Sequence, residues 1–584
     1  MKITAKILLF VLAAVMLLSS CTQTPPEGPE ETSAETPAES SSPAPEESAE
    51  PKESIPPESG ALGDPVIPDE PKKEKPENPE KTLFDKSKEP YNGGNMGCTE
   101  LAVPAEFNDG VDFDIKSFKD SEKKIYYLFL PCRADLSALT FTATHRDGSV
   151  SGPYTADFTD EEVSENEKTI GGINTYSIKV MQSDRPSVML QIDEQYCTIE
   201  EMLGDGSHET HAYGDMVATV TDRLAAQKGW ATKYMSLDVE ENSHCSMDIR
   251  GRGNATWGYP KRPFQFVTEN PINLFGMGYA KKYVLLSNYR DATGLRNQLA
   301  FEMGDLIGID YVSDNCQVDL FMNGEYLGMY LLAEKIEAGA GRVEIDHTKD
   351  VLYEYDNYAA DEPIFGFQTQ YSNQKKRGIR IHSPEVESLV NVSKARLIKA
   401  ETALFTGDEE GFQKYFDLDS WARMYLVQMY TMNSDAYYGS FYFYYSSQDR
   451  KLHACSPWDF DFSLGVSWGT GSYLDPNRYD LTNREWMKPM MGYRSFLLEL
   501  LEVYYHKGGK EVIESMPEVI RKLAEENRTS ALMNEIGAPT YYYPDDVTNY
   551  DEAVDYLLEI AEARVEFMDK LMSDYAAAYR FDKG

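Results

Sequence analysis

Two short acidic segments in the second half of the chain contain the residues best suited to chemistry. The first reads Asn433-Ser434-Asp435, and the second, about 25 residues later, reads Trp458-Asp459-Phe460-Asp461. Carboxylate and amide oxygens suit Mg²⁺ or Mn²⁺, which keep open positions for phosphate. The order along the chain is an acid with an amide, then a hairpin, then further acids. Phosphate-transferring sites use the same order, with the first acid as proton acceptor and the amide and the later acid as metal ligands. The same spacing of aspartates also suits a capped turn or a solvated surface.

Basic residues gather at two places in a chain whose formal net charge is −41. The first place lies between Arg250 and Arg262 beside several glycines, and the second joins Lys281 and Lys282 to Arg290 and Arg296. Polyphosphate binding needs exposed backbone amides with Lys or Arg side chains, although each of these residues could instead pair with the acidic majority. The chain has no Walker phosphate loop and no Asp-Phe-Gly sequence. A nucleotide phosphate is the counter-charge that we expect.

The elements that must position these residues mix strands with helices. Short β-type runs predict strands, the Asn323-Gly324 pair predicts a hairpin turn, and longer helical periodicity predicts helices, which dominate beyond Leu418 and close the chain as a bundle. We expect strands at 187–192, 235–239, 246–257 (running into a Gly-rich turn), 261–266, 282–286, 316–321, 326–333, 440–445 and 451–455, and helices at 295–307, 421–432 and 551–572.

Residues 97–185 have a pattern of predicted secondary structure that differs from that of the following sequence. Three β-type runs at 124–130, 139–144 and 175–181 alternate with turn-rich segments, and nothing among them looks catalytic. Short strands separated by turns are typical of a β-sandwich. We therefore expect a small Ig-like accessory domain for spacing or adhesion, followed by one large α+β domain over residues 186–575.

The N-terminus predicts export and anchoring. Two lysines precede an apolar run from Ile7 to Leu18, which is the pattern of a signal peptide over residues 1–20. The sequence Leu18-Ser19-Ser20-Cys21 resembles a bacterial lipobox, which implies lipidation of Cys21 on the extracytoplasmic face of the cell membrane; an ordinary secreted protein is the alternative. Residues 21–81 hold nearly half of the 30 prolines, with much Glu and Ser, so we expect a disordered and extended stalk.

Composition excludes several classes of partner. The 584 residues include 97 acidic and 56 basic residues, so neither nucleic acid nor an anionic membrane surface is expected, and the membrane is reached through the lipid anchor only. The stalk accounts for about a quarter of the negative charge. The later cysteines lack a CxxC pair and four-ligand zinc spacing, and they allow up to three disulfides or free buried thiols: Cys98, Cys132, Cys197, Cys245, Cys316 and Cys455.

Six ordered blocks between residues 186 and 575 resemble the spore-coat protein H (CotH) kinase family. Each block is modest alone, but six in one order are specific. The blocks are Ile249–Trp257 with Lys261–Phe264, Lys282–Leu286 with Asn288 and Asp291, Leu295–Asn297, Met322–Ile336, Asn433–Asp435, and Pro457–Asp461 with Gly465.

The resemblance implies an atypical protein-kinase-like fold with a β-rich amino lobe, a hinge at 332–335 and a helical carboxy lobe. Its cofactors would be ATP with Mg²⁺ or Mn²⁺. Asp435 would be the catalytic aspartate, and Asp459, Asp461 and Asn433 would hold the metal. The side chains at the ATP site would be Arg252, Asn254, Lys261, Arg262, Lys282, Arg296 and Glu334.

Functions of different classes remain open. The leading hypothesis is transfer of phosphate from ATP to Ser or Thr of a surface or secreted protein. Family members often carry Asn shortly after the catalytic aspartate, where this chain has Ser440, so the alternative is a non-catalytic pseudokinase that serves as a surface scaffold or interaction module. A third interpretation, carbohydrate chemistry at the paired acids, leaves the six blocks unexplained.

Overall fold

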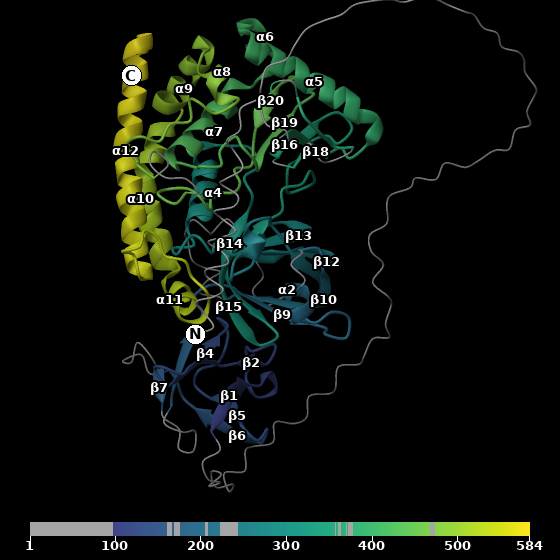
Figure 1. Cartoon of the computed structure of the whole chain (residues 1–584), viewed down its shortest axis with the longest axis vertical. Coiled ribbons are helices and arrows are strands. Elements are labelled where there is room, and N and C mark those ends of the chain that lie inside the picture. The colour runs from purple at the N-terminus through teal and green to yellow at the C-terminus, as the bar shows by residue number, and fades with distance from the viewer. Residues whose placement is uncertain are drawn as a thin grey trace, which may run out of the picture. The chain divides into compact units, whose positions relative to one another are not determined.

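The computed structural model describes residues 97–159, 166–168, 176–204, 208–221, 243–356, 358–359, 364–369, 371, 378–467 and 474–584. The predicted signal peptide, Cys21, the stalk and the strand expected at 235–239 lie outside these residues. The described part mixes strands and helices (Figure 1), so the predicted α+β class is confirmed. None of its helices combines the length and the apolar character that a membrane span requires.

The N-terminal part of the described chain is built from strands only, apart from one short 3-10 turn. Its strands form two sheets, in the orders β2-β1-β5-β6 and β3-β4-β8-β7. Leu101 and Phe141 of the first sheet share one buried core with Phe129 and Ile178 of the second. The strands are β1 (Cys98–Val103), β2 (Ile115–Lys116), β3 (Phe118–Asp120), β4 (Ile125–Leu130), β5 (Leu139–His145), β6 (Val150–Ala156), β7 (Asn166–Lys168) and β8 (Ser177–Gln182).

The core of these two sheets continues beyond the boundary expected at residue 185. Met189, Phe321 and Met533 belong to the same buried cluster, although they come from later elements. The Lys116 amide also donates to the Gly324 carbonyl at 2.8 Å. The boundary therefore marks a change of sheet and not a break in the packing.

Seven strands of the next part close into a barrel in the order β10-β11-β12-β13-β15-β14-β9 among the described residues. The β14–β15 hairpin was predicted from its turn, and Asn323 and Gly324 have φ values of 47° and 84°, which a two-residue hairpin turn requires. Parallel pairing of β9 with β14 closes the barrel. The strands are β9 (Ser187–Ile192), β10 (His211–Thr219), β11 (Ser243–Gly251), β12 (Phe264–Asn273), β13 (Tyr279–Leu286), β14 (Asn315–Met322) and β15 (Glu325–Glu334), with the short helix α2 (Ile199–Gly204) beside them.

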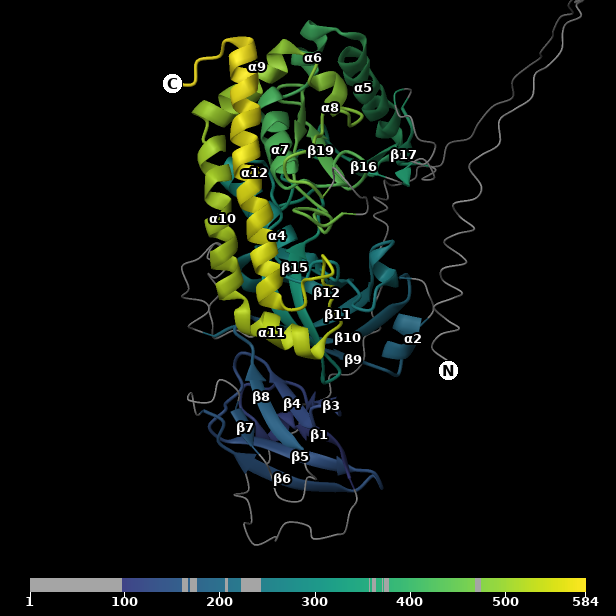
Figure 2. The same cartoon turned by 60° about the vertical axis from the view of Figure 1, so that its left-hand side comes forward.

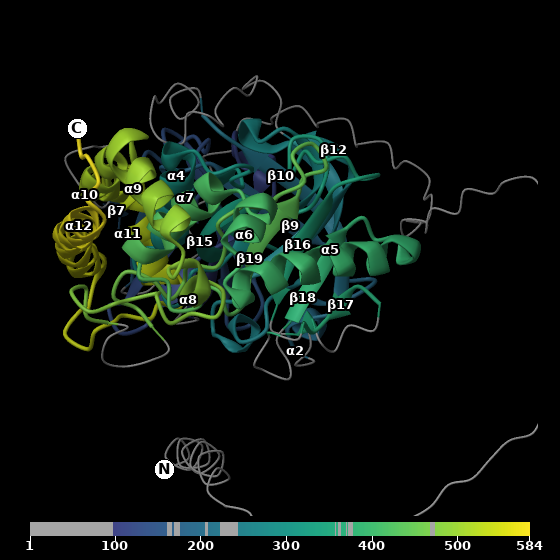
Figure 3. The ribbon, with the colours of Figure 1, turned by 90° about the horizontal axis from the view of Figure 1, so that it is seen from above.

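The remaining chain is mainly helical around a five-stranded sheet. Helices α10 and α12 pack side by side along one edge, and α5 with the small sheet lies toward the other (Figures 2 and 3). The strands are β16 (Val351–Asp356), β17 (Gly366–Phe367), β18 (Gly378–Ser383), β19 (Phe441–Tyr445) and β20 (Leu452–Ala454). The helices are α5 (Glu387–Thr406), α6 (Glu409–Tyr415), α7 (Leu418–Tyr430), α8 (Met487–Met490), α9 (Arg494–His506), α10 (Gly509–Glu526), α11 (Arg528–Gly537) and α12 (Tyr550–Tyr579).

Helix α4 (Arg296–Ile307) follows the barrel strand β13 and packs against α7 and α10. It was predicted at 295–307, and it ends where Gly308 adopts a left-handed φ of 83°. Its polar residues Asn297, Gln298 and Glu302 are buried together with its apolar ones. Buried polar groups such as these need hydrogen-bond partners, so α4 is placed to organise a polar site.

The six cysteines of the described part are free thiols. All are buried except Cys245, which is half-buried. Burial raises the pKa of the Cys316 thiol to about 12 and that of Cys245 to about 11. Of the two alternatives left open, disulfides or thiols, the structure has thiols. They are protonated and act as small apolar side chains.

Glu401 provides a test of the helical core. It is 1% exposed in α5, and burial raises its pKa to about 7 from an ordinary value of 4.5. The folded state therefore binds the Glu401 proton more tightly than the unfolded state does. The contribution of Glu401 to the free energy of unfolding is fully present below about pH 4.5 and is lost as the pH rises through 7. Replacement with Gln keeps an acceptor for the Trp486 indole N–H, now 3.0 Å away, without the titration.

We expect Glu401→Gln to leave the free energy of unfolding unchanged at pH 4.5 and to raise it by about 3 kcal/mol at pH 8.5. Denaturant unfolding at both pH values measures this, with Glu518→Gln, whose side chain is 80% exposed, as the control. An effect of the same size at both pH values would contradict the buried ionisation.

Candidate functional site

The two acidic segments lie side by side, as the short hairpin between them led us to expect. The Asn433 side-chain amide donates to the Asp459 carbonyl at 3.3 Å. The Ser434 amide and hydroxyl both donate to the Phe462 carbonyl, at 2.9 and 3.0 Å. The β19–β20 hairpin connects the segments, and α7 leads into the first of them. Asp435, Asp459 and Asp461 therefore belong to one site.

The backbone of this site is strained. Ser440 and Asp459 have positive φ values of 51° and 66°, and Met432 and Leu464 nearby are also left-handed, at 56° and 39°. Side chains other than glycine adopt this region at a cost of about 1–3 kcal/mol each, and such residues cluster at functional sites. Bonds such as that from the Leu464 amide to the Thr431 carbonyl, 2.6 Å long, hold the conformation.

The carboxyl groups of Asp459 and Asp461 are crowded. Burial raises the pKa of both, and the charge of Asp459 raises that of Asp461 further. A hydrogen bond from Ser440 and the positive charge of Arg252 act in the opposite direction on Asp459. The Arg252 guanidinium lies over the Trp458 ring, 5.8 Å from its centre. Two adjacent carboxylates with one arginine keep excess negative charge, which a divalent cation would balance, so the donor set fits Mg²⁺ or Mn²⁺.

Both ends of the Asn433 side chain, which is expected to be a metal ligand, form hydrogen bonds within the chain. It is buried, its amide group donates to Asp459, and its Oδ1 accepts from the Asp435 amide at 3.0 Å. Both ends of the side chain thus bind backbone groups of the two acidic residues. Asn433 therefore positions the acids, and its role as a metal ligand stays a prediction.

Asn297 is a site residue that sequence reasoning missed. Its Oδ1 accepts from the Phe460 amide at 2.8 Å, and its amide group donates to Asp461 and, at 3.0 Å, to Asn288. It therefore fixes the residue between the two aspartates from the buried helix α4. The signal in the sequence is its place in the Leu295–Asn297 block, next to the charged Arg296.

Arg296 is buried behind the site. It forms an ion pair with Asp291, and its other donors reach the Ser463 and Leu464 carbonyls at 2.9 and 3.0 Å. All three partners are internal, so the side chain ties α4 to the segment that follows Asp461. Its binding of a nucleotide stays a prediction that these internal partners do not favour.

A model of the CotH kinase protein family matches residues 249–568, which is more than half of the chain. The chain belongs to the CotH kinase family. No curated protein sequence matches it. The match begins inside β11 and covers Arg252, α4 and both acidic segments, so every residue of the site described above lies within the CotH kinase region.

Lys261, expected at the ATP site of this CotH kinase family member, has an internal role. Its ammonium group is buried and donates to the Met329 carbonyl at 2.6 Å and to Asn534 Oδ1 at 2.7 Å. Burial lowers its pKa to about 7. The side chain joins the barrel to α11, and phosphate binding by Lys261 stays a prediction that these bonds do not favour.

Arg262 and Glu334 are also committed to internal partners. Arg262 stacks on the Trp257 ring at 4.6 Å and donates to the Leu203 carbonyl. Glu334 is buried at the end of β15 in an ion pair with Arg342, and its Oε2 accepts from the Asp314 amide at 3.0 Å. These contacts give both side chains a structural role, and their roles at the ATP site stay predictions.

The remaining predicted residues stay accessible. Asn254 is exposed in the turn after β11, where Gly251 leaves room for the Trp257 ring; a Cβ at Gly251 would lie 2.3 Å from it. Lys282 is exposed and forms an ion pair with Glu337 at 3.2 Å. Arg252 is half-buried, with its guanidinium over the Trp458 ring.

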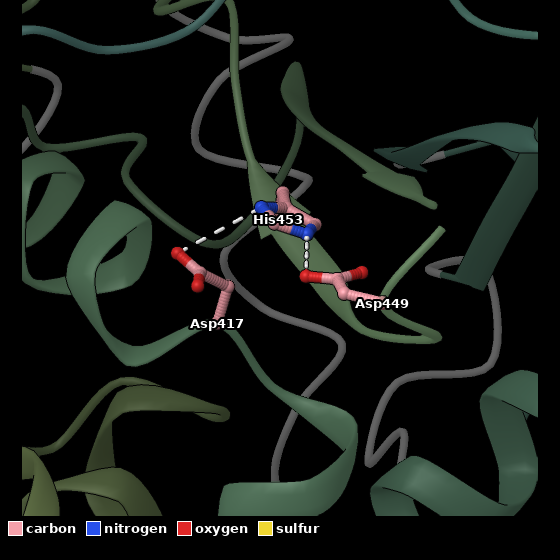
Figure 4. Close-up of side chains that lie close together, drawn as sticks. All are labelled: Asp417, Asp449 and His453. Atoms are coloured by element: carbon pink, nitrogen blue, oxygen red, sulfur yellow. Dashed lines mark hydrogen bonds and ion pairs between the residues drawn. The ribbon is translucent and has the colours of Figure 1, made fainter. Parts of the chain in front are cut away.

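A second group of possible metal ligands lies outside this site, at the start of α7. Figure 4 shows Asp417 and Asp449 on opposite sides of the His453 ring, 3.7 Å from Nδ1 and 2.9 Å from Nε2. Because each ring nitrogen faces its own carboxylate, a single ion would reach one nitrogen and one carboxylate at ordinary bond lengths. Asp417 also caps α7 by accepting from the Ser420 amide. We interpret this group as ion pairs that fix β20 to α7.

The internal role of Arg296 is testable. Arg296→Met leaves the buried Asp291 carboxylate and two carbonyls without their donor, and we expect it to lower the free energy of unfolding by about 3–5 kcal/mol. Denaturant unfolding measures the change, with the exposed Arg494→Met as the control. A loss no larger than that of the control would show that Arg296 is not a structural tie.

Proposed function

We propose that the protein is an atypical kinase that transfers phosphate from ATP to Ser or Thr side chains with the help of Mg²⁺ or Mn²⁺. The observation that carries the proposal is the crowded carboxylate pair, Asp459 and Asp461, beside Arg252. A divalent cation that carries phosphate balances both carboxylates and the arginine at once. Membership of the CotH kinase family supports the same kinase-like function.

In this proposal the barrel and the helical region act as two lobes of a kinase-like domain. Their junction would follow β15, which ends at Glu334. The backbone of the turn after β11, with Arg252 and Asn254, would meet the phosphates. The main chain after Glu334 would meet the adenine, because the Glu334 side chain is engaged by Arg342.

Asp435 would accept the proton of the attacking hydroxyl group. Asn433 holds the Asp435 amide and thereby its position next to the second acidic segment. Asp459 and Asp461 would hold the cation, which lowers the charge on the transferring group when it is bound. Asn297 fixes the backbone between the two aspartates through the Phe460 amide and donates to the Asp461 carboxylate.

We further propose that the enzyme works outside the membrane, anchored through lipidated Cys21 and raised on the stalk of residues 22–81. The phosphoacceptor would then be a surface or secreted protein. The two N-terminal sheets would serve as an accessory Ig-like domain for spacing or adhesion.

One observation favours a second candidate, a pseudokinase scaffold. Ser440 occupies the position where an amide ligand is expected, and its hydroxyl bonds to Asp459 instead of adding a carbonyl oxygen for metal. A site with one ligand fewer would bind nucleotide without efficient transfer. The two candidates differ in turnover and agree in nucleotide binding.

The kinase proposal is tested with the full chain in detergent, labelled ATP and Mn²⁺, using casein and the protein itself as acceptors. We expect Asp435→Asn to lower label transfer at least about 100-fold, because the proton acceptor is lost. Asp459→Asn should abolish Mn²⁺-dependent transfer. Asp449→Asn removes a carboxylate bonded to His453 outside the site and is the matched control, with unchanged transfer.

Binding without transfer would favour the scaffold. No nucleotide-induced thermal shift in the unaltered protein, with either metal, would contradict both candidates. Transfer that survives Asp435→Asn and Asp459→Asn would place the chemistry elsewhere.

The role of Ser440 is tested by Ser440→Asn. Asn tolerates the left-handed backbone at this position and adds an amide oxygen, so we expect about tenfold tighter Mn²⁺ binding by calorimetry. Ser447→Asn on the β19–β20 turn is the control. Unchanged Mn²⁺ affinity would show that residue 440 does not face the ion.

A further inference from the structure

Arg290, just beyond β13, is enclosed by aromatic rings. Its guanidinium carbon lies 4.1 Å from the centre of the Tyr541 ring, 5.7 Å from Tyr259 and 5.9 Å from Phe462. Tyr289 packs against Tyr259 at 5.2 Å and against Tyr541 at 6.1 Å, so Arg290 is half-buried beside a cluster of four aromatic rings. A cation within about 6 Å of ring faces is attracted to them and is held in a fixed orientation.

Arg290 lacks the partners that other enclosed arginines have. Its Nε is buried without a hydrogen-bond partner, and within the described ranges no carboxylate forms an ion pair with it. Arg296 and Arg342, by contrast, are paired with Asp291 and Glu334. The Tyr259 hydroxyl beside it is also buried without a partner. In a chain of net charge −41, an enclosed arginine that attracts no acid indicates a site for an external anion.

The enclosure adjoins the acidic site. Phe462 directly follows Asp461 in the chain, and its carbonyl receives both bonds from Ser434. Burial raises the pKa of the Tyr259 hydroxyl, the charge of Arg290 lowers it, and the charges of Asp461 and Asp435 raise it further. Arg290 is therefore close to the residues proposed to hold the cation and to orient the acceptor hydroxyl.

We infer that Arg290 is a phosphate-binding residue and receives the terminal phosphoryl group of the nucleotide. The inference rests on the proposed kinase function. The planar guanidinium can offer N–H groups of one edge to phosphate oxygens while the rings hold its faces and exclude water, which strengthens such a contact. It supplies the positive charge for phosphate that Lys261 and Arg262, engaged within the barrel, do not.

A carboxylate of the acceptor protein is the other anion to consider. It would bring a further negative charge beside Asp435 and Asp461 without a cation of its own. The nucleotide phosphate arrives with its metal, which offsets that repulsion. The terminal phosphate is therefore favoured over an acidic peptide.

The test compares a non-hydrolysable ATP analogue (AMP-PNP) with ADP, because only the first carries a terminal phosphate at the inferred position. Affinities are measured by calorimetry on the full chain in detergent with Mn²⁺. We expect Arg290→Met to weaken AMP-PNP binding by about 10- to 100-fold and ADP binding by less than about threefold. Arg290→Lys, which keeps the charge without the planar edge, should fall between.

Two further variants guard against a folding defect. Arg396→Met removes an arginine that stacks on Tyr445 at 4.6 Å in α5, and it should leave both affinities unchanged. Tyr541→Leu removes the nearest ring but keeps the guanidinium, and it should weaken AMP-PNP binding about 3- to 10-fold with ADP unchanged. Thermal unfolding of each variant reports whether it folds.

Equal losses for AMP-PNP and ADP, or no loss for either, in a folded Arg290→Met protein would overturn the inference and leave the kinase proposal standing. Tight binding of an acidic peptide that requires Arg290, with unchanged AMP-PNP affinity, would also overturn it. If the unaltered protein bound neither nucleotide, the proposed function would fail and this inference would fail with it.

Discussion

The need to place two carboxylates side by side, Asp459 and Asp461, is the constraint on which the rest of the site depends. Burial raises the pKa of both, the charge of Asp459 raises that of Asp461 further, and Ser440 and Arg252 lower the pKa of Asp459. The two carboxylates stay adjacent because side chains from two other segments hold the backbone around them. Asn433 reaches the Asp459 carbonyl from the first acidic segment, and Asn297 grips Phe460 and Asp461 from α4. We propose that this framework receives a divalent cation.

Helix α4 connects that framework to the rest of the molecule. It follows the barrel strand β13 in the chain and packs against α7 and α10, so it connects the barrel to the helical region. Arg296 on its first turn joins Asp291 to the carbonyls that follow the acidic pair. Phosphate binding by the barrel and metal binding by the helical region would therefore be coupled through a rigid buried element and not through a flexible loop.

Local features of the sequence predicted local features of the structure. The Asn323-Gly324 turn, the helix after Leu295 and the approach of the two acidic segments follow from short-range patterns, and all are present. The roles of the basic residues depended on distant partners instead. Lys261 binds Asn534, 273 residues away, and Arg290 is enclosed by Tyr541 from the loop after α11. Closure of the barrel by parallel pairing of β9 with β14 is long-range in the same way. No pattern within one segment contains such information.

The most direct test of the account is to locate the cation itself. Anomalous diffraction from crystals of the protein grown with Mn²⁺ and a non-hydrolysable ATP analogue would reveal the ion and the phosphates together. The account predicts Mn²⁺ between Asp459 and Asp461, with phosphate oxygens at Arg252 and Arg290. Mn²⁺ at the Asp417–Asp449–His453 group alone, or nucleotide bound away from the acidic pair, would contradict it.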